Sequence, residues 1–296
     1  MLFRSANVAL GAWSTGGNLN TGRQSLAGNG TTTSSLAYGG NKNPSNTRGA
    51  DTEQYNGTTW GEVNNLNTAR DNLSGAGTNN TAAVAFGGDT PGSPGPTTVT
   101  ELWNGYTWTE VNNLNDASPN AGSLGTSTAA LNFGGGGTVN NESWNGTNWT
   151  EVGDLNTARD SNAGGAGTTS AGLAFGGKEP SPAVTGNTES WNGSAWSEVN
   201  NMNDDRRQLV GTGTQTSALA FSGEDPGTGS KTSTESWNGT NWSNVENLST
   251  GRVVADGSGA SNTSALCFGG ATALTATEEW DGTGFIIETL TTTSDN

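Results

Sequence analysis

The sequence predicts an all-β fold, a six-bladed β-propeller with four antiparallel strands in each blade. Three observations predict it: a unit of 41 to 48 residues occurs six times, a glycine pair closes the second strand of the unit, and an aromatic-Asn-Gly or aromatic-Asp-Gly turn follows the third strand. A period of this size with four short strands in each unit is typical of propeller blades. The turn aromatics are Tyr55, Trp103, Trp144, Trp191, Trp237 and Trp280.

The units run through nearly the whole chain, so we expect one closed ring rather than two domains. Residues 1–18 are predicted to be an N-terminal segment with a ring-closing strand, and residues 291–296 to be a tail. The propeller is predicted over residues 19–290, with units of about 19–66, 67–114, 115–155, 156–202, 203–248 and 249–290.

The four strands can be placed in the second unit. Residues 73–77 are the expected first strand, and the hydrophobic run 82–86, closed by a glycine pair, is the second. The third strand ends at Trp103 and the fourth begins at Trp108. The pair Asn104-Gly105 between them predicts a tight hairpin, because both central residues of a type I′ turn need a positive φ. No segment has a convincing helical period.

Two segments compete for the last outer strand of the ring. The N-terminal Gly11-Ala12-Trp13 has the pattern of a fourth strand, and Phe285 occupies the equivalent place near the C-terminus. The N-terminal segment therefore either adds an outer strand to the last blade or displaces the strand at Phe285. Closure matters because an open propeller exposes two apolar sheet faces.

The repeated motifs resemble the kelch family. In the second unit the matching residues are Arg70, Gly87, Gly88, Glu101, Trp103 and Trp108, and the resemblance covers about residues 19 to 290. The third unit departs from the pattern, because Ala117-Ser118-Pro119 replaces the usual Thr-Ala-Arg. These motifs are specific for the fold and carry almost no information about function.

The resemblance implies structural roles for the repeated charged and aromatic residues. It pairs Arg23, Arg70, Arg159, Arg207 and Arg252 with glutamates such as Glu53, Glu101, Glu189, Glu235 and Glu278, and Glu142 holds the matching place in the third unit. It places Trp60, Trp108, Trp149, Trp196 and Trp242 between blades. Two alternatives stay open: the ion pairs bind a ligand, or the tryptophans are exposed platforms for sugars.

The charge balance excludes several partners. The net charge is −16, with 11 basic and 27 acidic residues and no basic cluster. Nucleic-acid binding and attachment to an anionic membrane both need clustered cations, so neither is expected. No segment approaches the ~18 apolar residues of a membrane helix. The first 13 residues make a poor signal peptide.

The sequence predicts no catalytic residue, no cofactor and no metal site. There is no histidine and one cysteine, Cys267, which excludes zinc sites and His-activated nucleophiles. Calcium ligation by Asp204-Asp205 or Glu224-Asp225 stays an alternative, although neither pair has EF-hand spacing. A glycosidase needs paired acids near the central channel. The strands expected there, at 75–77 and 164–167, contain only glycine and alanine.

The loops between the second and third strands are the predicted binding surface. They have 12, 12, 6, 11, 11 and 7 residues, and the long ones hold most of the prolines. Binding residues concentrate on loops that a rigid scaffold presents, although neutral drift in loop length is the alternative. The candidate residues are Asn43, Pro44, Pro91, Pro94, Pro96, Glu179, Pro180, Pro182, Glu224, Asp225 and Pro226.

These observations favour a non-enzymatic structural or binding propeller. The Trp-Asn-Gly-Thr and Leu-Asn-Thr-Ala-Arg motifs also resemble kelch-like repeats of marine bacteriophage structural proteins. That resemblance implies a virion component, a capsid decoration or a tail fibre, at the virion surface. Its partners would be other virion proteins or a host-surface glycan or protein, with homo-oligomers formed through assembly. The alternatives are a secreted or cell-surface lectin, which predicts exposed aromatics in the long loops, and a glycan-processing enzyme.

Overall fold

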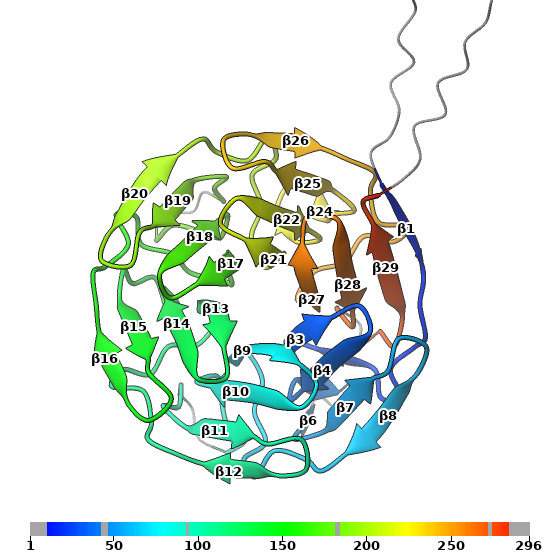
Figure 1. Cartoon of the computed structure of the whole chain (residues 1–296), viewed down its shortest axis with the longest axis vertical. Coiled ribbons are helices and arrows are strands. Elements are labelled where there is room, and N and C mark those ends of the chain that lie inside the picture. The colour runs from blue at the N-terminus through cyan, green and yellow to red at the C-terminus, as the bar shows by residue number, and fades with distance from the viewer. Residues whose placement is uncertain (1–10, 43–46, 93–94, 181–183, 272–273, 284–296) are drawn as a thin grey trace, which may run out of the picture.

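The computed structural model describes residues 11–42, 47–92, 95–180, 184–271 and 274–283. These residues contain strands and no helix, and the strands form six four-stranded, one three-stranded and one two-stranded antiparallel sheet. Figure 1 shows the four-stranded sheets arranged around a central opening. The predicted all-β propeller is confirmed.

Each blade runs from an inner strand at the channel to an outer strand at the rim. The first blade contains, in that order, β3 (Ala27–Thr31), β4 (Ser34–Tyr38), β7 (Thr52–Tyr55) and β8 (Trp60–Val63). The second contains β9 (Ser74–Asn79), β10 (Ala82–Phe86), β11 (Thr100–Trp103) and β12 (Trp108–Glu110). The third contains β13 (Gly122–Thr126), β14 (Ala129–Phe133), β15 (Asn141–Trp144) and β16 (Trp149–Glu151).

The remaining blades repeat this order. The fourth contains β17 (Gly164–Thr168), β18 (Ala171–Phe175), β19 (Thr188–Trp191) and β20 (Trp196–Val199). The fifth contains β21 (Val210–Thr214), β22 (Ser217–Phe221), β25 (Thr234–Trp237) and β26 (Trp242–Asn244). The last contains β27 (Asp256–Ser261), β28 (Ser264–Phe268), β29 (Thr277–Asp281) and β1 (Ala12–Thr15). The loops add β2 (Arg23–Gln24), β5 (Asn41–Lys42), β6 (Thr47–Arg48), β23 (Glu224–Asp225) and β24 (Gly229–Ser230).

The inner strands form the channel and bring neighbouring blades into close contact. Strands β3, β9, β13, β17, β21 and β27 each neighbour the next one, and β27 neighbours β3. Glycine makes this approach feasible. A Cβ on Gly75 would overlap the hydroxyl of Tyr38, and a Cβ on Gly28 would overlap the ring of Phe268. In both cases the ring belongs to the preceding blade, so the missing side chain makes room for a buried aromatic.

Backbone hydrogen bonds join neighbouring blades at five of the six boundaries around the channel. In each of these five bonds, the residue whose amide donates has a left-handed backbone, as Ser25 (φ 52°) and Asn72 (φ 53°) have. The amide of Asn72 donates to the carbonyl of Ser25 at 2.9 Å, and the amide of Ser25 donates to Val254 at 2.9 Å. The same bond recurs from Asn120 to Asn72 and from Asn162 to Asn120, and Gln208 donates to Ser161. These bonds satisfy backbone groups that would otherwise be buried without partners.

The N-terminal strand supplies the outer strand of the last blade. β1 pairs antiparallel with β29, and Trp13 lies opposite Trp280. The chain therefore joins its first described strand to its last one, as Figure 1 shows at the edge where β1 and β29 meet. The competing segment at Phe285 lies outside the described residues.

Candidate functional site

Four of the expected arginine–glutamate pairs form inside single blades, and all eight side chains are buried. The N–O distances are 2.9 Å for Arg23–Glu53, 3.2 Å for Arg70–Glu101, 3.0 Å for Arg159–Glu189 and 2.9 Å for Arg252–Glu278. Arg23 also donates from Nη1 to the carbonyls of Gly39 and Asp51. Each pair therefore ties the connection before the first strand to the third strand of its blade.

Burial has a clear effect on these arginines. It lowers the pKa of Arg70 to about 10, and the nearby Glu101 carboxylate partly offsets that shift. Burial lowers the pKa of Arg23 and Arg159 as well. A buried guanidinium that is held by a carboxylate and by backbone carbonyls has a structural role.

The fifth pair corrects the sequence prediction. Arg206, and not Arg207, contacts Glu235, with Nη1 2.6 Å from Oε1. Arg207 lies on the surface and pairs with Glu224 at 2.7 Å. The reason is register. In the second unit, Asn67 binds Glu101, and Arg70 three residues later pairs with the same glutamate. In the fifth unit, Asn203 binds Glu235, and the residue three positions later is Arg206.

The third blade has no arginine at this position, and its glutamate is held by hydrogen bonds from neutral donors. Glu142 accepts from the amide and side chain of Asn115 at 2.9 and 2.7 Å and from the amide of Asp116 at 3.0 Å. Three residues after Asn115 stands Ser118, whose Oγ accepts a 2.6 Å bond from Asn132 Nδ2. Other blades carry a small residue such as Ala85 at the position of Asn132, so the third blade has a buried Asn132–Ser118 hydrogen bond where the others have a small residue and an arginine.

The five predicted tryptophans lie between blades. Each is only 4–6% exposed. Their aromatic partners in the preceding blade lie 4.7–5.3 Å away, centroid to centroid, in the pairs Trp60–Phe268, Trp108–Tyr38, Trp149–Phe86, Trp196–Phe133 and Trp242–Phe175. The alternative of exposed sugar platforms is wrong for these residues.

A sixth tryptophan completes the set. Trp13 on β1 packs 5.0 Å from Phe221 of the fifth blade, as its counterparts do in the other blades. Its indole N–H donates to Thr234 at 3.0 Å, and the corresponding bonds from Trp60, Trp108, Trp149 and Trp242 to threonines are 3.1 Å. Trp196 differs, because Asn141 stands in place of the threonine and the buried indole N–H has no partner.

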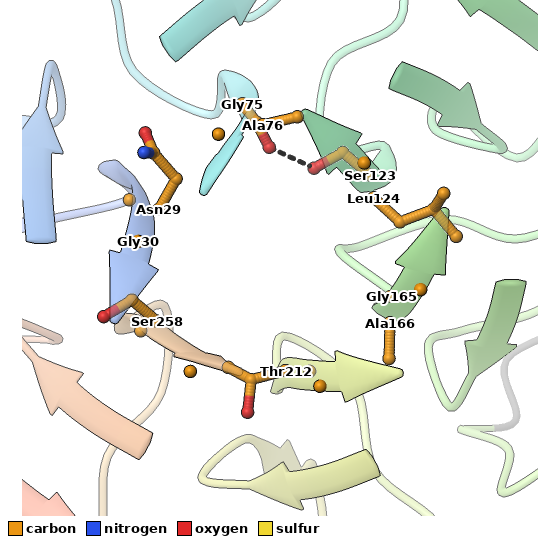
Figure 2. A pocket seen from close by; sticks show the side chains of 18 residues that line it. Asn29, Gly30, Gly75, Ala76, Ser123, Leu124, Gly165, Ala166, Thr212 and Ser258 are labelled. Atoms are coloured by element: carbon orange, nitrogen blue, oxygen red, sulfur yellow. Dashed lines mark hydrogen bonds between the residues drawn. The ribbon is translucent and has the colours of Figure 1, made fainter. Parts of the chain in front are cut away.

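Few side chains on the channel wall could bind or react with a ligand. Figure 2 shows the side chains of Asn29, Leu124, Thr212 and Ser258 directed away from the opening. The rest of the lining is mainly glycine, with a few small or polar residues such as Ala76, Ala166 and Ser123, around two cavities of about 100 and 90 Å³ that share lining residues. Ser123 closes one gap between blades by donating to the carbonyl of Gly75 at 3.0 Å.

One acid lines these cavities in the part of the chain that the structure describes. Asp256 accepts from the amide of Gly28 in the first blade at 2.7 Å and from Gly257 at 2.7 Å. Burial raises its pKa to about 7. Glycoside hydrolysis normally uses two carboxyl groups that flank the bond to be broken, and Asp256 has no such partner among the described lining residues. Its contacts join the last blade to the first.

The predicted binding loops share a face with the connections before the first strands, and we call this surface the loop face. β2 pairs with β5, and isolated bridges join Asp71 to Asp89 and Arg207 to Glu224. Pro91, Pro96, Pro180 and Pro226 are exposed there. Glu179 accepts from Asn187 at 3.1 Å, and Asp225 accepts from the amide of Gly227 at 2.9 Å. Asn43, Pro44, Pro94 and Pro182 lie outside the described residues.

Charges on the loop face are largely paired with one another. Lys42 contacts Asp51 at 2.5 Å, Arg48 contacts Asp71 at 2.7 Å, and Lys231 contacts Asp204 at 2.7 Å. The acids considered for calcium thus include two that are held by cations, Asp204 and Glu224. In the described ranges no three His, Cys, Asp and Glu side chains are grouped so that they could hold a metal ion.

The opposite surface, which we call the hairpin face, has a different character. It consists of the tips of the first hairpins at 32–33, 79–81, 127–128, 169–170, 215–216 and 262–263 and the turns at 56–59, 104–107, 145–148, 192–195, 238–241 and 281–283. Tip and turn touch in every blade, as Thr81 and Gly105 do. Asp281 is the one charged residue in these segments. The rest are mainly Asn, Thr, Ser and Gly.

Tyr106 on the hairpin face is the one large hydrophobic side chain that is exposed among the described residues, at 79%. It follows the Asn-Gly pair of the second blade, where the other turns have Thr58, Thr147, Ser194, Thr240 and Thr283. The predicted site residues were taken from the long, proline-rich loops, and exposed aromatics were expected only under the lectin alternative, so this turn is absent from them. Aligning the turns unit by unit would have found it.

Other observations limit the range of functions. Burial raises the pKa of the Cys267 thiol to about 12, which makes it a poor nucleophile. Within the described ranges, no helix has the length and apolar character needed to cross a membrane. Comparisons with protein-family models and with curated proteins find no match. The function is therefore inferred from the geometry of this chain.

Proposed function

We propose that this chain is a non-enzymatic binding and assembly module built from kelch-type repeats. The observation that carries the proposal is how the repeated polar residues are used. Arginines, glutamates and tryptophans that could serve a ligand are buried in contacts that hold the ring together, as Arg70 is with Glu101 and Trp60 is with Phe268. The exposed surface that remains is rigid and repetitive, which suits binding better than catalysis.

The channel supports the same proposal. Its described lining is mainly glycine with small or outward-directed side chains, and Asp256 uses both carboxylate oxygens in hydrogen bonds to amides. A glycan-processing enzyme would need a second carboxyl group across a substrate. The enzyme alternative is therefore the weakest of the three.

We further propose that the module is a component of a bacteriophage virion, a capsid decoration or a tail fibre. The resemblance of its motifs to phage structural repeats and the low charge of the hairpin face support this assignment. A chain with a net charge of −16 repels its own copies. The tips and turns of the hairpin face hold one charged residue, so they add little to that repulsion where copies or other virion proteins approach.

Mass spectrometry of purified virus particles from the source that encodes the chain tests this assignment. Stoichiometric recovery in particles is the expected result, and copy number separates a decoration, present in hundreds of copies, from a fibre, present in far fewer. Recovery only from the particle-free fraction would contradict the assignment and would leave a secreted binding protein as the better proposal.

A further inference from the structure

The backbone that carries Tyr106 is held firmly. The side chain of Asn104 accepts hydrogen bonds from the amides of Tyr106 and Thr107, each at 2.9 Å. Asn64 of the first blade donates to the carbonyl of Tyr106 at 2.7 Å. The ring is 79% exposed, so the fold fixes the backbone of Tyr106 and presents its ring to solvent. A tyrosine on a fixed backbone has only two χ angles to order on binding, which keeps the entropic cost low.

The exposed ring breaks the symmetry of the propeller. Among the five other described turns, four have threonine at this position and the turn of the fourth blade has serine. The hairpin therefore does not require an aromatic residue there. Structural residues in this chain repeat from blade to blade, as the buried tryptophans do. The fold therefore does not require the aromatic side chain of Tyr106, which occurs once in this set of turns and faces solvent.

The surroundings of the ring indicate the kind of ligand. The hairpin face carries one charge, that of Asp281 on the last blade, and no cation in its described segments. A sulfated, sialylated or phosphorylated ligand would find no counter-charge there. The turn that carries the ring is bordered by neutral polar residues: Asn64 and Asn104 bind the backbone of Tyr106, and Thr81 lies against Gly105. Such groups both donate and accept hydrogen bonds, as sugar hydroxyls require.

We infer that the hairpin face binds a neutral carbohydrate chain, with a sugar ring stacked on Tyr106 and its hydroxyl groups bound by the amides and hydroxyls around it. The C–H face of a hexose is apolar and its edge is polar, which matches an aromatic surface bordered by Asn and Thr. The inference goes beyond the proposed assembly role. Binding by the isolated chain can be found whether or not the chain is recovered from particles.

The test uses the full-length purified chain with amylose, mannan and galactan as neutral probes and heparin as an anionic probe, by affinity electrophoresis and calorimetry. We expect binding to at least one neutral polymer and none to heparin. Tyr106→Thr installs the residue of the first, third and fifth blades, so the fold is retained. It should weaken binding about tenfold with an unchanged melting temperature. Tyr106→Trp should preserve binding, and Thr147→Ser on the third blade is the matched control.

Three results would overturn the inference. The first is no binding to any neutral polymer in the panel, and the second is equal binding by the wild type and Tyr106→Thr. The third is a wild-type dimer that Tyr106→Thr converts to monomer in sedimentation experiments, because Tyr106 would then be a contact between two copies of the chain.

Discussion

The indole N–H of Trp13 donates a hydrogen bond to Thr234 Oγ1 at 3.0 Å, across 221 positions of sequence. The bond crosses the boundary between the fifth blade and the last one. It reproduces the contact that Trp60, Trp108, Trp149 and Trp242 make at their own boundaries. The N-terminal strand thus completes the last blade with the same residue type and the same contact as the strands that belong to the repeats.

Trp13→Ala should lower the free energy of unfolding by about 3 kcal/mol, the low end for truncating a tryptophan, because this indole is only partly buried. Trp13→Phe keeps the packing on Phe221 and should cost about 1 kcal/mol for the lost hydrogen bond. Chemical denaturation measures both, with Trp60→Ala as the matched variant. Wild-type stability in Trp13→Ala would show that the N-terminal strand does not close the ring.

Arg206 and Arg207 form a natural pair for testing the structural role of the buried ion pairs. Arg206→Ala leaves Glu235 buried without its cation and should destabilise the protein by about 3–5 kcal/mol. Arg207→Ala removes a pair in which both side chains are more than 20% exposed and should cost less than about 1 kcal/mol. Thermal and urea unfolding of the two variants compares them directly. A larger loss for Arg207→Ala would contradict the observed register.

The unpaired indole N–H of Trp196 offers a stabilising substitution. Asn141→Thr places at this boundary the residue that accepts the bond at the others, and it should add about 1 kcal/mol of stability. The reciprocal change, Thr188→Asn, removes the acceptor for Trp242 and should destabilise by a similar amount. Melting temperatures that move in the same direction for both variants would refute this account.

Asp256 predicts a specific pH dependence. Burial raises its pKa from the ordinary 3.8 to about 7, so the folded state holds the proton more tightly than the unfolded state. The sign follows: the contribution of Asp256 to stability is greatest below about pH 4 and is lost as the pH rises to about 7. Asp256→Asn should flatten this part of the curve of unfolding free energy against pH. Parallel curves for the wild type and the variant would mean that the carboxyl group titrates normally.

Local patterns predicted most of the strands in the second unit. The predicted second strand, 82–86, coincides with β10, and the predicted end and start at Trp103 and Trp108 match β11 and β12. The first strand was predicted at 73–77, whereas β9 covers Ser74–Asn79. The second strand is easiest to predict because it is buried on both faces, and a continuous apolar run reports that directly.

The candidate site was harder to predict because its signals are not local. The choice between Arg206 and Arg207 depends on which side chain reaches Glu235, 29 residues later in the chain than Arg206. The raised pKa of Asp256 depends on the channel that other blades build around it. Tyr106 was visible in the sequence, but only the structure shows that its ring is exposed and that its backbone contacts the first blade.

Local sequence patterns were enough to predict the all-β propeller and the order of strands inside a unit, because strand alternation, glycine pairs and Asn-Gly turns act over a few neighbouring residues. The closure of the ring by Trp13, the burial of Arg206 and the gathering of nearly uncharged turns on one face could be seen only in the folded chain. Those properties arise where distant segments meet, and the free energy of such contacts depends on burial and geometry that no single segment contains.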